Sequence, residues 1–160
     1  MALLQVGNQY FNYPDPGTEA GWGEDATGWA EAVTNALTAL IAPGDILPTS
    51  LVIQDGQSTA ADVTGLFFNS NTIRAANIDY AVYRVSSSTN PGVAESGRLM
   101  IDLNDTAPTG SKWSLIQIKN GDAGVTFSVT DGGQIQYTST TIGLTGYTGV
   151  IDFSAKTLSK

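Results

Sequence analysis

The stretch from Val125 to Thr138 reads VTFSVTDGGQIQYT and decides the fold class. Apolar and hydroxyl side chains alternate over 125–130, which is the period of a strand with one buried face. Asp131-Gly132-Gly133 supplies residues that a tight turn needs, and alternation resumes over 134–138. The stretch therefore predicts an antiparallel β-hairpin.

Similar apolar or alternating runs occur on both sides of this hairpin. About seven or eight short strands are predicted, and Gly, Asn, Asp, Ser and Pro separate them. No helical pattern lies between them, which argues against a parallel α/β sheet. We predict a mainly β fold, an antiparallel β-sandwich or jelly-roll-like domain over 46–160. The additional predicted strands include 51–53, 66–68, 78–85, 98–103, 113–119 and 149–155.

The segment before this domain has a different pattern. Residues 24–41 are predicted to form one amphipathic helix, because Trp29, Val33, Leu37 and Leu40 follow each other at helical spacing. Residues 1–23 are predicted to be an irregular extended arm, since they contain aromatic residues and two prolines. A short strand over Leu3, Leu4 and Val6 is the alternative within this arm. We assign 1–45 to this arm and helix.

The apolar side chains of the arm and helix are candidates for an oligomer or attachment interface. The helix either packs on its own domain or bundles with copies of itself around a symmetry axis, and the pattern leaves both open. The arm either lies on the body of the chain or on a neighbour. The candidate interface residues are Tyr10, Phe11, Tyr13, Trp22, Trp29, Val33, Leu37 and Leu40.

The charge is concentrated in one part of the 160-residue chain. Residues 1–73 contain eight acids and no base, so they account for the whole net charge of −8. Such a segment repels nucleic acid and anionic membranes, so we expect neither as a partner. A basic protein surface is the better hypothesis for a partner, and the alternative is that the acids only serve solubility. We find no membrane span and no signal peptide, so we expect synthesis in the cytoplasm without secretion.

Candidate catalytic and ligand-binding patterns are weak. The chain has no Cys and no His, which excludes a thiol nucleophile, a Ser-His triad and a zinc site of those ligands. We expect no catalytic residue, no cofactor and no metal. The weak calcium-ligand pattern at 102–105 is predicted to be a strand end with an Asx turn, and the partial phosphate-loop pattern at 109–112 is predicted to be an ordinary loop. Five strand and loop aromatics offer a possible glycan-binding face, but core positions are more common for them: Tyr80, Tyr83, Trp113, Tyr137 and Tyr147.

Residues 78–85, 124–139 and 149–158 resemble, in this order, a β-rich module of accessory virion proteins of tailed bacteriophages. These proteins include capsid decoration proteins, head fibres and tail fibres. Residues 12–17 and 21–30 resemble the N-terminal segment of such proteins. The resemblance implies a non-enzymatic virion protein that forms an oligomer, most often a homotrimer.

Two functions follow as hypotheses. The favoured one is a homotrimeric capsid decoration or cement protein that contacts the major capsid protein or another virion protein. The alternative is a short head or tail fibre, or adhesin module, that binds a host-surface glycan.

Overall fold

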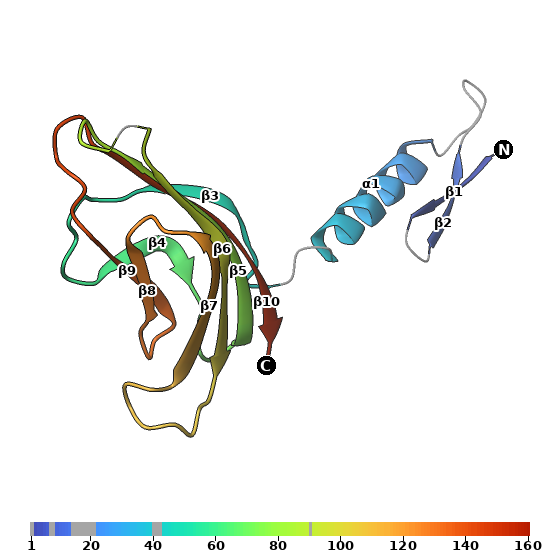
Figure 1. Ribbon diagram of the computed structural model, residues 1–160. Coiled ribbons are helices and arrows are strands. Elements are labelled where there is room, and N and C mark those ends of the chain that lie inside the picture. The colour runs from blue at the N-terminus through green and yellow to red at the C-terminus, as the bar shows by residue number, and fades with distance from the viewer. Residues whose placement is uncertain (1, 7–8, 14–21, 40–42, 90) are drawn as a thin grey trace. The chain divides into compact units, whose positions relative to one another are not determined.

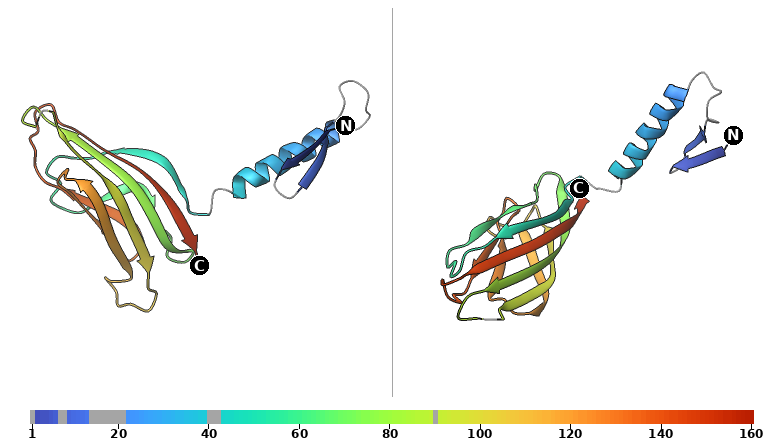
Figure 2. Two further views of the ribbon diagram at one scale, coloured as in Figure 1. Left: turned by 45° about the vertical axis from the view of Figure 1, so that its right-hand side comes forward. Right: turned by 90° about the horizontal axis from the view of Figure 1, so that it is seen from above.

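A computed structural model describes residues 2–6, 9–13, 22–39, 43–89 and 91–160, and the side chains of 26–37, 43–89 and 91–160. The chain divides into two compact units, Met1–Ala42 and Pro43–Lys160. Figures 1 and 2 show both units.

The first unit contains a short hairpin and a helix. Strands β1 (Ala2–Val6) and β2 (Gln9–Tyr13) pair antiparallel, with Ala2 opposite Tyr13. The short strand considered for Leu3, Leu4 and Val6 is present as β1. The irregular arm predicted over 9–13 is wrong, because a five-residue strand is too short to show a clear alternation. Helix α1 covers Trp22–Ala39, so it begins and ends slightly earlier than the predicted 24–41.

Five strands of the second unit form its larger sheet. Their order is β3-β10-β5-β6-β7, and each neighbouring pair is antiparallel. All five are visible in Figure 1. Their bounds are β3 Ile46–Val52, β5 Ile73–Val85, β6 Val93–Leu103, β7 Trp113–Gly121 and β10 Thr148–Ser159.

The smaller sheet has the order β4-β9-β8, with β4 at Ala61–Phe67, β8 at Val125–Val129 and β9 at Gln134–Ser139. The predicted hairpin is confirmed, because β8 and β9 pair antiparallel across the Gly132-Gly133 turn. Gly133 has φ +91°, and a Cβ there would overlap the carbonyl oxygen of Phe68. Its own carbonyl accepts a 2.9 Å hydrogen bond from the Phe68 amide, so the turn is fixed against the end of β4.

The core lies between the two sheets, which confirms the predicted mainly β, antiparallel sandwich. Alternate residues of the long strands are buried, as the sequence pattern of β5 indicates. Tyr80 of the larger sheet meets Phe127 of the smaller one edge-on, with ring centroids 4.9 Å apart. The largest buried apolar side chains include Ile53, Val63, Leu66, Phe68, Ile78, Leu99, Ile101, Ile135 and Ile151.

The strand registers give the second unit two distinct ends. Ile46, near the start of this unit, lies opposite Ala155 of β10, while Val52 lies opposite Val150. Loops that follow Val52, Val85 and Gly121 therefore emerge at the end away from Pro43, together with the loop before β10. We call 53–57, 86–89, 121–124 and 140–147 the distal loops; they lie at one end of the sandwich in Figure 1.

Candidate functional site

Five of the eight predicted interface residues lie where the structure describes no side chain. Tyr10, Phe11 and Tyr13 fall on β2, and Trp22 is the first residue of α1. Leu40 is outside the described residues. Their role as an interface stays a prediction.

The other three lie on α1, where their side chains are described. Trp29 is 45% exposed and Leu37 is 58% exposed, while Val33 is half-buried. Their spacing of four residues places them on one side of the helix. An exposed Trp and Leu on one helix side leave apolar area in contact with water, so this side is available for a partner.

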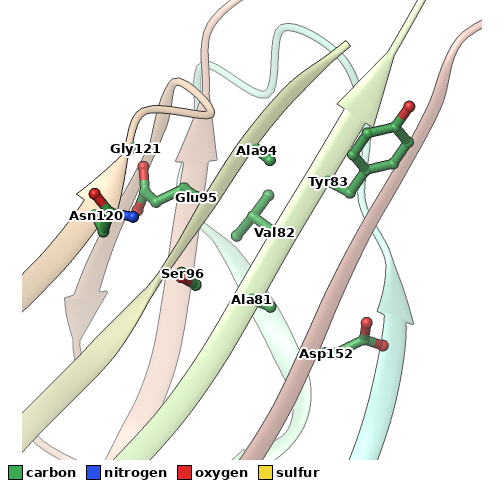
Figure 3. A pocket seen from close by; sticks show the side chains of 9 residues that line it. All are labelled: Ala81, Val82, Tyr83, Ala94, Glu95, Ser96, Asn120, Gly121 and Asp152. Atoms are coloured by element: carbon green, nitrogen blue, oxygen red, sulfur yellow. The ribbon is translucent and has the colours of Figure 1, made fainter. Parts of the chain in front are cut away.

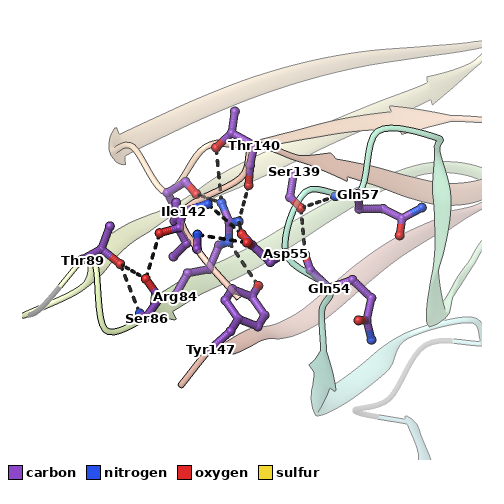
Figure 4. A network of polar contacts seen from close by, with 12 residues as sticks. Gln54, Asp55, Gln57, Arg84, Ser86, Thr89, Ser139, Thr140, Ile142 and Tyr147 are labelled. Atoms are coloured by element: carbon purple, nitrogen blue, oxygen red, sulfur yellow. Dashed lines mark hydrogen bonds and ion pairs between the residues drawn. The ribbon is translucent and has the colours of Figure 1, made fainter. Parts of the chain in front are cut away.

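Arg84 is the centre of a buried polar network that joins the distal loops (Figure 4). Its side chain lies on the core side of β5 and is 0% exposed. All five guanidinium N–H groups find acceptors, which buried polar groups require. The acceptors are Asp55 Oδ1 at 2.8 Å, Ala123 O at 2.6 Å, Tyr147 Oη at 3.2 Å, Thr140 Oγ1 at 3.5 Å and Thr140 O.

Asp55, the ion-pair partner of Arg84, connects this network to the 140–147 loop. Its carboxylate is also 0% exposed, and it accepts backbone hydrogen bonds from Ile142 at 2.8 Å and Gly143 at 3.0 Å. The Asp55 carboxylate therefore ties the 53–57 loop to the 140–147 loop, while Arg84 reaches the 121–124 loop. The arrangement fixes loop positions, and because every charge is satisfied within the protein, it offers no free group for catalysis.

A second buried carboxylate, Glu95 of β6, holds β7 in place. Glu95 accepts hydrogen bonds from Tyr80 Oη at 2.7 Å, Gln117 Nε2 at 3.0 Å, Lys119 Nζ at 2.9 Å and the Ala123 amide at 3.1 Å. Burial raises the pKa of Tyr80 to about 12, with a further contribution from the Glu95 carboxylate. The hydrogen bond to Glu95 raises the pKa of Lys119 above its ordinary value.

The outer face of the larger sheet carries a shallow hollow of about 310 Å³ (Figure 3). Its central row crosses four strands, since Asn120, Ser96, Ala81 and Asp152 lie opposite one another in turn. The small side chains of this row leave room between Asn120 at one side and Tyr83 with Asp152 at the other.

Tyr83 is the aromatic side chain of this hollow. It is 47% exposed, and its hydroxyl donates a 2.9 Å hydrogen bond to the Pro91 carbonyl, which fixes the ring. Asp152 accepts a hydrogen bond from the Ser50 hydroxyl of the neighbouring strand. A flat ring beside a carboxylate is a combination that can stack on a sugar and bind its hydroxyls.

The other aromatics proposed for a glycan face are not gathered in it. Tyr80, Trp113 and Tyr137 are at most 6% exposed and belong to the core, and half-buried Tyr147 accepts from Arg84. The core position, which is the more common one for strand aromatics, is confirmed for these three residues. A glycan face built from all five residues is therefore wrong, and Tyr83 alone is left for it.

The weak ligand patterns have ordinary structural roles. The Asn104 side chain accepts from the Thr106 amide at 3.1 Å, which confirms the Asx turn after β6. Asp131 accepts from the amides of Gly110 and Lys112, and these bonds hold its pKa below the ordinary value. No group of three or more metal-ligating side chains occurs within the described residues. Among the described helical residues, no segment combines the length and apolarity needed to cross a bilayer.

Comparisons with known proteins yield one distant likeness. No protein-family model matches the chain, and no curated protein matches it. Among solved structures, the tailspike protein of Acinetobacter phage vB_ApiP_P1 is similar with a TM-score of 0.41 and 9% sequence identity. The match covers 71% of this chain and 22% of the tailspike chain. At that TM-score the likeness carries no argument about function.

Sequence reasoning missed both buried carboxylates and Arg84. One signal for Arg84 is present, because Ile78, Tyr80, Val82 and Arg84 occupy alternate positions of one strand. A charged residue that continues an inward-facing series has to find a buried partner. No local pattern identifies that partner as Asp55.

Proposed function

We propose that the chain is a non-enzymatic structural protein of a tailed-phage particle, and that it decorates or cements the head as a homotrimer. Residues 1–45 attach and trimerise the protein, and the β-sandwich forms the outer body. The phage assignment is based on the sequence resemblance over 12–17, 21–30, 78–85, 124–139 and 149–158.

The observation that carries this proposal is the exposed apolar side of α1. The β-sandwich has a closed core of its own, so it needs no further apolar partner to fold. The first unit presents Trp29 and Leu37 to solvent on one side of its helix. Burial of a Leu or Trp side chain contributes on the order of 2 kcal/mol, which favours association through this helix. Copies of α1, or the head surface, are the partners that the proposal assigns to it.

The charge distribution also favours attachment through the N-terminal residues. Residues 1–73 contain no base, while residues 74–160 contain equal numbers of acids and bases. An acidic attachment segment is attracted to a basic patch on the head and repelled by similar acidic surfaces. Salt should therefore weaken attachment to the particle.

Composition analysis of purified particles tests the proposal. We expect the protein in genome-filled heads at a copy number that is a multiple of three. Its absence from such heads rejects the cementing role.

Native mass spectrometry of the full chain tests the helix contact. Leu37→Lys should shift the trimer toward monomer, because a charge replaces an apolar contact. Asn35→Lys, on an exposed polar position of the same helix, is the control and should leave the trimer intact. Equal behaviour of both variants would show that this side of α1 is not the contact.

The hollow on the larger sheet favours a second candidate function, glycan binding by a short fibre or adhesin module. Tyr83 would stack on a pyranose ring and Asp152 would bind its hydroxyls. Asn120 lies three strands from Asp152, so it would contact a neighbouring unit of an oligosaccharide. Asp152 makes an anionic sugar unfavourable, so a neutral glycan fits better. A glycan array with the full chain tests this function: Tyr83→Ala should remove binding, and Leu158→Ala on the same sheet should not. No binding at high protein concentration removes this candidate.

A further inference from the structure

Strand β7 forms a free edge of the larger sheet. It pairs with β6 on one side, and no strand of the described residues pairs with its other side. An edge strand presents unpaired N–H and C=O groups that can accept another strand. Its outward side chains Ile116 and Ile118 are 56% and 60% exposed, so the edge is also apolar.

The remaining edge strands are shorter or interrupted. β3 contains Pro48, which cannot donate a ladder hydrogen bond. β4 has an irregular register between Asp62 and Phe67, and β8 has five residues. β7 has nine residues and no proline. Natural proteins protect edges that must stay unpaired with prolines, bulges or charged side chains. β7 has no proline and no register irregularity, and its charged residue, Lys119, is paired with Glu95.

We infer that β7 pairs with β7 of a second copy in antiparallel orientation, so that two larger sheets join into one. We propose a second copy as the partner because two antiparallel β7 strands fit each other when they are centred on Gln117. In that register all nine residues find a partner, Trp113 opposite Gly121 and Leu115 opposite Lys119. Ile116 of each copy then lies opposite Ile118 of the other, and the contact is isologous.

Charge does not oppose this contact. Lys119 is the charged residue of β7, and Glu95 of its own chain pairs with it at 2.9 Å. Residues 74–160, which include β7, have no net charge. Gln117 and Lys119 are both held by Glu95, so the strand is ordered before it meets a second copy and loses little conformational freedom on pairing.

The inference does not depend on the helix contact proposed above. Where α1 also joins three copies, β7 pairing links neighbouring trimers through two-fold contacts. The Leu37→Lys chain should therefore still pair through β7.

Disulfide cross-linking of full-length protein tests the register, because the native chain has no cysteine. An equimolar mixture of Ile116→Cys and Ile118→Cys proteins should give a mixed covalent dimer. Directly opposite residues have Cβ atoms about 4.5–5.5 Å apart, whereas like positions are diagonal at about 7–8 Å. A disulfide needs about 3.5–4.5 Å, so each variant alone should cross-link at least several-fold less.

Two controls complete this experiment. A mixture of Val52→Cys and Leu158→Cys proteins carries thiols of similar exposure on the same sheet, and it should show background cross-linking. Cross-linking of the Ile116 and Ile118 mixture at this background level overturns the inference. In sedimentation, Ile118→Lys or, independently, Asn120→Lys should weaken association at least tenfold, while Leu158→Lys should not. Equal association of all these folded variants also overturns it.

Discussion

Replacement of Arg84 by Met tests whether the buried network stabilises the body. Met keeps most of the side-chain length and removes the charge and all five donors. The change leaves Asp55 buried at 0% exposure with two backbone donors but no cation. It also removes the hydrogen-bond donor to the Ala123 carbonyl, the Thr140 carbonyl and the Tyr147 hydroxyl.

The expected loss is large for one substitution. Removal of one partner from a buried ion pair costs about 3–5 kcal/mol, because the other charge stays buried without compensation. A domain has a total stability of about 5–15 kcal/mol, so the variant should lose a substantial part of it. Arg98→Met is the matched control: its partner Asp79 is 62% exposed, and we expect only a small effect.

Urea denaturation of the full chain, followed by near-ultraviolet circular dichroism, measures this difference. The signal reports packed aromatics such as Tyr80, Phe127 and Tyr137, which belong to the body. We expect a much lower urea midpoint for Arg84→Met than for Arg98→Met. Equal midpoints for the two variants would refute a stabilising role for the network.

A double variant separates the ion pair from the remaining bonds. Asp55→Asn in the Arg84→Met background removes the unpaired carboxylate while it keeps the size of the side chain. We expect this variant to recover part of the lost stability, since the buried charge is the main cost. Additive losses would instead show that the two residues act independently.

Three further predictions concern turns and titration. Gly133→Ala should destabilise the protein by more than the ~1 kcal/mol that left-handed backbone strain costs. Gly110→Ala has open space at its Cβ and should cost about that strain alone. Thermal unfolding of the two variants measures the difference. Because burial raises the pKa of Tyr80 to about 12, its contribution to stability is complete below pH 10.0 and is lost as the pH rises through about 12. Urea titrations between pH 9 and 12 check this against Tyr80→Phe, which should flatten the dependence. The hydrogen bond from Arg98 lowers the pKa of Asp79, so Arg98→Met should return that pKa toward 3.8 in a carboxyl NMR titration, and an unchanged value contradicts the pairing.

The sequence predicted the fold class because burial in this sandwich follows a period of two. Val125 and Phe127 are buried, and the Gly132-Gly133 turn lies where the pattern changes direction. Strand ends were less predictable: β6 begins at Val93, where Ser96 and Gly97 do not show a strand pattern. Pairing with β5 and β7 on both sides extends the strand through these residues.

The candidate sites show why topology limits sequence reasoning. The spacing of Trp29, Val33 and Leu37 predicted an apolar helix side, and α1 exposes Trp29 and Leu37. Asp55 and Arg84 meet across 29 positions of sequence, and only strand order brings them together. The hollow at Tyr83 likewise combines residues of four strands, so no local motif announces it.

A cryo-electron microscopy map of the purified particle tests the central claim most directly. We expect density for residues 1–45 against the head surface around a three-fold axis, with the β-sandwich and its distal loops pointing away from the head. A map in which the sandwich contacts the head while the N-terminal residues point outward, or in which the chain is absent from the head, would contradict it.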